Sequence, residues 1–185
     1  MRMLFRRLHL LATFILGLSV TLAQESAKPA PKELDFLKGS IGVWDAAIEV
    51  WSQGPDGESI KFSGVEMNRA YGEYWIASDF DSEFAGQTMK VHSIVGYDLD
   101  QGKLIGKVID HGPYAASMTG EYDTKAKAVH WTTKAKMPDG TTIIQKTVVT
   151  QKSPDERVLV LSVPDKAGDG FVKFMEIKFT KRASE

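Results

Sequence analysis

Residues 43–51, VWDAAIEVW, decide the fold class because their side chains alternate with a period of two. Successive side chains of an extended strand point to opposite faces, so one face of this segment carries only apolar groups. That face consists of Trp44, Ala46, Ile48 and Val50. The segment therefore predicts a β-strand whose Trp44 face is turned inward.

The same period continues along the chain to Arg182. In residues 74–84 (YWIASDFDSEF), acidic side chains share the outer face, and the inner face carries Tyr74, Ile76, Phe80 and Phe84. Turn-forming residues interrupt the pattern at 53–57, 72, 86, 98–102, 112–113, 123–127, 138–140, 153–155 and 164–170. These nine clusters separate ten candidate strands. The two faces differ less in polarity in residues 141–151 and 157–163. A partly polar barrel interior or a shifted register would produce this pattern.

Short connections between so many strands favour antiparallel pairing of chain neighbours in a meander. A twisted sheet of about ten strands normally closes, because closure removes its exposed edges. We therefore expect an all-β fold, a closed antiparallel meander barrel of about ten strands. It forms a single domain over residues 33–185, and a short helical turn at residues 34–37 precedes the first strand.

Composition excludes several classes of function. The 185 residues include 23 Lys and Arg against 24 Asp and Glu, so the chain lacks the basic excess that nucleic-acid binding requires. It contains no cysteine, which excludes disulfides, thiolate metal sites and a cysteine nucleophile. Its histidines show no metal-ligand spacing, and phosphate-binding glycine loops and nucleophile elbows are absent. We therefore predict no metal site, no cofactor and no catalytic residue.

The first 23 residues have the pattern of a secretory signal peptide. Arg2, Arg6 and Arg7 precede an apolar run over residues 8–22, and small residues allow cleavage after Ala23. The run is shorter than the ~20 residues that span a bilayer, which favours cleavage over an uncleaved anchor. We expect a periplasmic or secreted protein without a stable membrane anchor, exported by the general or the twin-arginine route. Residues 24–32 are expected to form a disordered linker.

Five motifs are spread over the chain. They are the opening segment 34–44 with Gly42-Val43-Trp44, Gly96-Tyr97-Asp98, Val108-Ile109-Asp110, Gly120-Glu121-Tyr122-Asp123 and the closing segment 175–182. Together they resemble the bacterial family called domain of unknown function 1579, over residues 34–182. The resemblance implies a lipocalin-like or fatty-acid-binding-like barrel of the calycin type, with no established activity. In calycin barrels an Arg stacks on a Trp ring at the closed end, which implies a structural clasp between Trp44 and Arg182.

Six residues are candidates for contacts with a ligand in the barrel interior: Arg69, Tyr74, Phe80, Tyr97, Asp110 and Glu176. Glu176 either forms a surface salt bridge or points inward with Arg69 as its partner, because an unpaired buried carboxylate is strongly penalised. Asp110 either caps the Gly112-Pro113 turn or pairs with the adjacent His111 as an acid–base couple. His92 and His130 lie on polar faces and are expected in solvent.

These patterns favour a non-enzymatic binding module that holds a small apolar or amphipathic molecule in its lumen. One alternative is a haem-binding or isomerase-type enzyme resembling the nitrobindin-like barrels. Those proteins bind haem through a His near the carboxyl end, and this chain has no His after His130. Another alternative is a protein-interaction module that uses exposed Trp51 and Trp75. The sequence leaves the ligand and the oligomeric state open.

Overall fold

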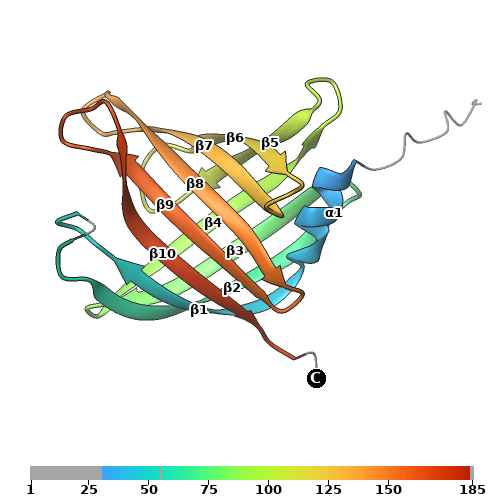
Figure 1. Cartoon of the computed structure of the whole chain (residues 1–185), viewed down its shortest axis with the longest axis horizontal. Coiled ribbons are helices and arrows are strands. Elements are labelled where there is room, and N and C mark those ends of the chain that lie inside the picture. The colour runs from blue at the N-terminus through green and yellow to red at the C-terminus, as the bar shows by residue number, and fades with distance from the viewer. Residues whose placement is uncertain (1–30, 55, 184–185) are drawn as a thin grey trace, which may run out of the picture.

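Ten antiparallel strands form a closed barrel in the computed structural model, which describes residues 31–54 and 56–183 (Figure 1). A helix, α1 (Lys32–Gly39), precedes them. The strands are β1 (Gly42–Val50), β2 (Ile60–Tyr71), β3 (Trp75–Phe84), β4 (Gln87–Asp98), β5 (Lys103–Ile109), β6 (Ala116–Asp123), β7 (Ala128–Lys136), β8 (Thr142–Ser153), β9 (Glu156–Pro164) and β10 (Phe171–Lys181). The predicted signal peptide, residues 1–23, lies outside the described residues. So does most of the predicted linker, residues 24–32, but its last residue, Lys32, is the first of α1.

Each strand pairs with its neighbours along the chain, and β1 pairs with β10 to close the barrel. This closing pair runs from Trp44 opposite Lys181 to Val50 opposite Met175. All nine predicted turn clusters fall at connections between strands. Gly86, for example, has a φ of +75° in the β3–β4 turn, which glycine adopts without steric cost. The predicted all-β meander of about ten strands is therefore confirmed.

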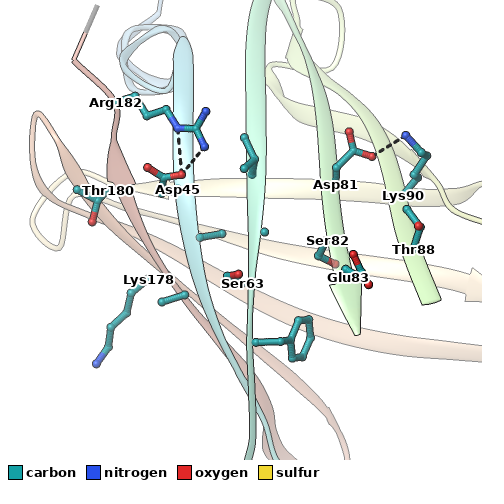
Figure 2. A pocket seen from close by; sticks show the side chains of 15 residues that line it. Asp45, Ser63, Asp81, Ser82, Glu83, Thr88, Lys90, Lys178, Thr180 and Arg182 are labelled. Atoms are coloured by element: carbon teal, nitrogen blue, oxygen red, sulfur yellow. Dashed lines mark hydrogen bonds and ion pairs between the residues drawn. The ribbon is translucent and has the colours of Figure 1, made fainter. Parts of the chain in front are cut away.

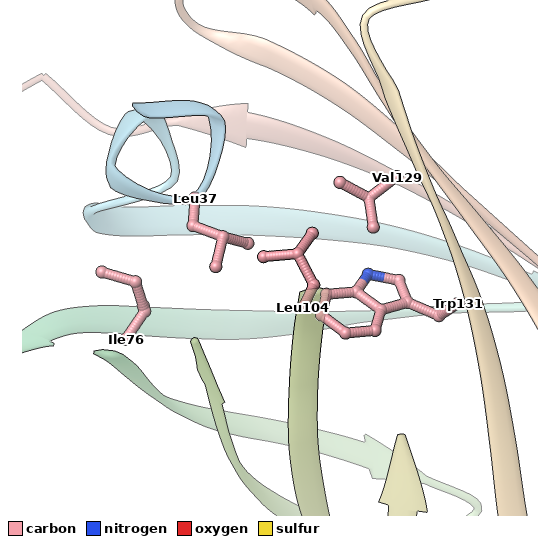
Figure 3. Close-up of a cluster of buried hydrophobic side chains, with 5 residues drawn as sticks. All are labelled: Leu37, Ile76, Leu104, Val129 and Trp131. Atoms are coloured by element: carbon pink, nitrogen blue, oxygen red, sulfur yellow. The ribbon is translucent and has the colours of Figure 1, made fainter. Parts of the chain in front are cut away.

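Helix α1 covers one end of the barrel, which we call the closed end (Figure 1). The ring of Phe36, in α1, packs against Tyr122 at the end of β6, with ring centroids 5.1 Å apart. Leu34 is fully buried. Below the helix lies an apolar cluster (Figure 3) made of Leu37, Ile76, Leu104, Val129 and Trp131. Within the described residues, no helix has the length and apolar character needed to cross a membrane.

A second apolar cluster lies where β1 meets β10. Trp44, Ala46 and Ile48 pack there against Ile177 and Phe179. Trp44 has no exposed surface. The inward face predicted from residues 43–51 is therefore confirmed. Burial of this face contributes to the hydrophobic stabilisation of the barrel where β1 and β10 meet.

The outer face of β3 carries acidic side chains, as predicted. Asp79 contacts both Arg69 and His92, and Asp81 forms an ion pair with Lys90. Each of these groups is about half exposed, so such pairs contribute little net stability.

The two tryptophans proposed as exposed anchors are only partly exposed. Lys173 places its Nζ 4.0 Å from the centre of the Trp51 ring. The Trp75 ring lies against Gly96, where an added Cβ would stand 2.5 Å from its Cε3. The prediction of exposed Trp51 and Trp75 is wrong, because neighbouring strands on the outer face supply a lysine stem and a bare glycine backbone that cover the rings.

Candidate functional site

The barrel encloses a cavity of about 600 Å³. At the closed end its floor includes Leu37, Ile76 and Trp131. At the opposite end, which we call the open end, the β5–β6 and β7–β8 connections line it with Pro113, Tyr114, Met137 and Pro138. Its walls are mostly apolar, with Phe62, Phe80, Val91, Leu159, Leu161 and Met175 among the lining residues. A volume of this size is typical of sites for small molecules.

A buried polar cluster lines the cavity toward the closed end, centred on the carboxylate of Glu66. Asn68 donates its Nδ2 to Glu66 Oε2 at 3.0 Å, and Ser78 donates its hydroxyl to Glu66 Oε1 at 3.2 Å. The guanidinium of Arg157 forms an ion pair with the same carboxylate. The Glu66 side chain is 14% exposed and that of Arg157 is 7% exposed. Both charges are thus held inside the barrel, where they need partners to persist.

Arg157 lies close to two aromatic rings. Its guanidinium carbon is 4.6 Å from the centre of Trp44 and 4.1 Å from the centre of Phe179. Its Nε and Nη2 have no well-formed hydrogen bond with the described residues, although Nη2 touches Glu66. Burial lowers the pKa of Arg157 to about 9, which leaves it protonated at neutral pH. Arg157 therefore carries buried hydrogen-bond donors that the protein does not saturate.

Strand alternation explains how these residues meet. Glu66 shares the inner face of β2 with Phe62 and Asn68, and Arg157 shares the inner face of β9 with Leu159. The polar cluster is also tied to the helix, because Asn68 Nδ2 and Trp44 Nε1 both donate to the carbonyl oxygen of Ser40, at 3.0 and 2.7 Å. The segment that follows α1 is thus held at the cavity floor by two hydrogen bonds to the Ser40 carbonyl oxygen.

The family described as protein of unknown function DUF1579 matches residues 30–181. The chain belongs to this family. A search among curated proteins found no match. The resemblance seen in the sequence motifs is confirmed, and it covers nearly the whole barrel.

Two solved structures share the fold of this DUF1579 barrel at low sequence identity. An S-type phycobiliprotein lyase from Guillardia theta is 10% identical with a TM-score of 0.56, covering 85% of this chain and 96% of that one. The protein Rv2717c from M. tuberculosis is 10% identical with a TM-score of 0.60, covering 83% of this chain and 99% of that one. At such identities the likeness shows the barrel fold alone.

Two of the six candidate ligand contacts line the cavity of the DUF1579 barrel. Phe80 projects from β3 into the lumen. Asp110 lies at the open end, where its Oδ1 accepts a hydrogen bond from the backbone N–H of Gly112 at 2.7 Å. Asp110 therefore caps the turn, one of the two roles considered for it. Contact of either residue with a ligand stays a prediction.

Arg69 and Glu176 do not line the cavity, contrary to the prediction that they face the lumen. Arg69 pairs with Asp79 on the outer face, and Glu176 pairs with Lys173 and Lys178. The reason is strand parity. Arg69 follows Asn68, which points inward, and Glu176 precedes Ile177, which is buried in the core. For Glu176 the surface salt bridge, the other alternative, is the one found.

Tyr74 and Tyr97 are also absent from the cavity lining. Tyr74 lies in the β2–β3 turn, where its carbonyl oxygen accepts the N–H of Tyr97 at 3.2 Å. Tyr97 packs against the cluster under α1. Both residues lie at the closed end, Tyr74 in a turn and Tyr97 next to the last residue of β4.

The predicted clasp between Trp44 and Arg182 is wrong in its choice of arginine. Arg182 points to the outer face and binds Asp45, with Nη2 2.6 Å from Oδ1. Period two along β10 places Arg182 with Lys178 and Thr180, outside, while Phe179 points inward. The ring of Trp44 is covered instead by Arg157 from β9.

The three histidines of the described chain lie away from the cavity. His92 and His130 are exposed, as predicted, and His92 Nδ1 lies 2.6 Å from Asp79 Oδ1. His111 is exposed in the β5–β6 connection. A haem ligated from the lumen would need an imidazole there, and the described residues that line the cavity include no histidine.

Proposed function

We propose that this protein is an exported, non-enzymatic barrel that binds a small amphipathic molecule in its central cavity. The observation that carries the proposal is the pairing of apolar walls with a buried polar cluster at one end. Few convergent polar groups in an otherwise apolar pocket are the usual arrangement of a small-molecule site.

The polar cluster gives the site a direction. Glu66 already accepts hydrogen bonds from Asn68 and Ser78, whereas Arg157 retains unsaturated donors. A ligand group that accepts hydrogen bonds is therefore favoured near Arg157, and an apolar body would lie against Phe80, Leu161 and their neighbours. Phe80 and Asp110 remain candidate contacts, the second at the open end.

Export is proposed from the sequence of residues 1–23, whose charged start, apolar run and small residues match a signal peptide. Expression of the full chain in a bacterial host, followed by fractionation and intact-mass measurement, tests this. A periplasmic product that starts at Gln24 supports export. A cytoplasmic product that retains Met1 contradicts it.

Cavity binding is tested by filling the cavity. Leu161 lines it, whereas Val160, the next residue of β9, faces the opposite side of the sheet. We expect Leu161→Trp to weaken binding of 11-(dansylamino)undecanoic acid by roughly tenfold or more, because the larger ring takes ligand space. Val160→Trp is the matched control and should bind as the unchanged protein does. Equal binding by both variants, or no saturable binding by the unchanged protein, would overturn the proposal.

A further inference from the structure

The outer wall of the barrel carries a groove of about 1050 Å³ (Figure 2), lined by β10, β1, β2, β3 and β4. Charged side chains flank it, with the Asp45–Arg182 pair on one side and the Asp81–Lys90 pair on the other. The base of the groove is unusual because it includes Phe62, Gly64 and Ser82, whose positions belong to the inner faces of β2 and β3. The groove therefore contacts residues of the inner faces at the place where these two strands separate.

Backbone pairing explains why inner-face residues line the groove. The β2–β3 ladder ends at Gly64 opposite Ser82. However, β2 stays paired with β1 as far as Ile60, and β3 stays paired with β4 as far as Phe84. Ser63 and Phe62 are thus left without their expected partners, Glu83 and Phe84. We call this break, formed by residues 62–63 and 83–84, the lateral seam.

The strands approach closely just before they separate. A Cβ added at Gly64 would stand 2.9 Å from both the Asp81 carbonyl oxygen and the Phe80 ring. Beyond that point the contact across the seam is between rings, because Phe62 and Phe84 have centroids 5.1 Å apart. Ring contact can separate by side-chain rotation, whereas a hydrogen-bonded ladder cannot.

The groove beside the seam and the central cavity share a lining residue. Phe62 lines both the outer groove and the cavity. Ser82, at the last paired position, is 6% exposed, and its hydroxyl has no hydrogen-bond partner among the described residues. A buried hydroxyl without a partner beside an aromatic pair offers one polar contact to a molecule that passes between the strands.

We propose that the lateral seam is an entrance to the cavity, closed by the Phe62–Phe84 contact and opened when these rings swing apart. The proposal rests on the cavity-binding function above and names the shape of the ligand. The unpaired edge of β2 runs from Ser63 to Ile60 and reaches the open end, which leaves a narrow slot between β2 and β3 that suits an extended unbranched chain with one polar end. The ligand class is therefore a single-chain amphiphile.

The test uses the absence of cysteine from the chain. Ser63→Cys with Glu83→Cys places one thiol on each side of the seam, and a short bifunctional thiol reagent bridges them. The matched control bridges the open end through Tyr114→Cys with Lys136→Cys, where Lys136 Nζ lies 5.2 Å from the Tyr114 ring centre. Stopped-flow fluorescence measures the association rate of 11-(dansylamino)undecanoic acid before and after bridging.

Bridging the seam is expected to slow association by roughly tenfold or more, while the equilibrium affinity stays within about twofold, since the cavity itself is unchanged. Because Tyr114 and Lys136 line the cavity, the control rate is compared within that double variant alone, and bridging its open end should not change it. A slower rate only with the bridge at the open end, or with neither bridge, overturns the entrance while cavity binding stands. If the unbridged protein does not bind the probe, that result contradicts both the cavity-binding function and the proposed entrance.

Amide hydrogen exchange gives a readout that needs no ligand. Among residues 62–63 and 83–84, the amides that point across the seam rather than to β1 or β4 should exchange faster than those amides of residues 65–69 that point to β3. Equal protection of the two groups would overturn the opening of the seam directly.

Discussion

The guanidinium of Arg157 lies over the ring of Trp44, 4.6 Å from its centre, with the Phe179 ring at 4.1 Å and Glu66 as its ionic partner. One cationic side chain thus joins β1, β2, β9 and β10 at the closed end. The same side chain lines the cavity. Stability of the barrel and polarity of the proposed site therefore depend on one residue.

Replacing Arg157 by Ala is expected to destabilise the protein by about 3–5 kcal/mol, because the change leaves Glu66 as a buried charge without its cationic partner. Arg182→Ala is the matched control. It removes an exposed partner of Asp45 and should change the denaturant midpoint little. Chemical denaturation of the two variants measures the difference. Similar midpoints would mean that Arg157 is not the cation that supports the closed end.

A companion variant separates charge from packing. Adding Glu66→Gln to Arg157→Ala removes the unpaired carboxylate but keeps a side chain of similar size. Part of the lost stability should return, because the neutral amide carries a smaller desolvation penalty. No recovery would assign the whole effect to the lost stacking on Trp44 and Phe179.

Trp44→Ala should cost about 3–5 kcal/mol, since it empties a fully buried site. Trp51→Ala should cost clearly less stability, because Trp51 is partly exposed on the outer face. Its ring is covered there by the Lys173 side chain. Denaturant midpoints at constant m-value measure both effects. Equal midpoints would contradict the assignment of inner and outer faces in β1.

Much of the fold was predictable because turns and alternation are local signals. Gly72, Gly86 and the other breakers lie where the chain must reverse, and the acids of β3 mark its outer face. Alternation alone does not locate the ends of a strand. In the sequence, the alternation that includes Ile76 extends back to Tyr74, whereas in the structure Tyr74 belongs to the β2–β3 turn.

The polar cluster of the cavity was not predictable in the same way. In β9, Arg157 shares its face with Leu159 and Leu161, but the opposite face carries Val158 and Val160 and is equally apolar. In β2, Val65 and Met67 lie on the face opposite to Glu66 and make that outer face apolar in the same way. When both faces of a strand are apolar, period two cannot choose the inner one. Tertiary pairing supplies that choice, and it places Arg157 and Glu66 inside while Arg69 and Glu176 lie outside.

Acid should destabilise the barrel partly through Asp79. The hydrogen bond with His92, followed by the charge of Arg69, holds the pKa of Asp79 below its ordinary value of 3.8. A carboxyl with a lower pKa in the folded chain stabilises the fold above the ordinary value, and this contribution is lost as the pH falls through the folded pKa. Asp79→Asn should therefore lose slightly less stability than the unchanged protein as the pH falls from about 5 to below 3.8, a small difference because Asp79 is about half exposed. Identical pH profiles of thermal unfolding would contradict this.

Haemin should not bind this barrel through a histidine. His92 and His130 face solvent and His111 lies exposed in the β5–β6 connection, so none is placed to ligate iron from the lumen. We expect titration of haemin into the protein that lacks residues 1–23 to give no saturable one-to-one Soret shift. His92→Ala, His111→Ala and His130→Ala should each leave the spectra unchanged. A stoichiometric shift that one of these three changes abolishes would identify a ligating histidine, and it would favour a haem protein over the binding barrel proposed here.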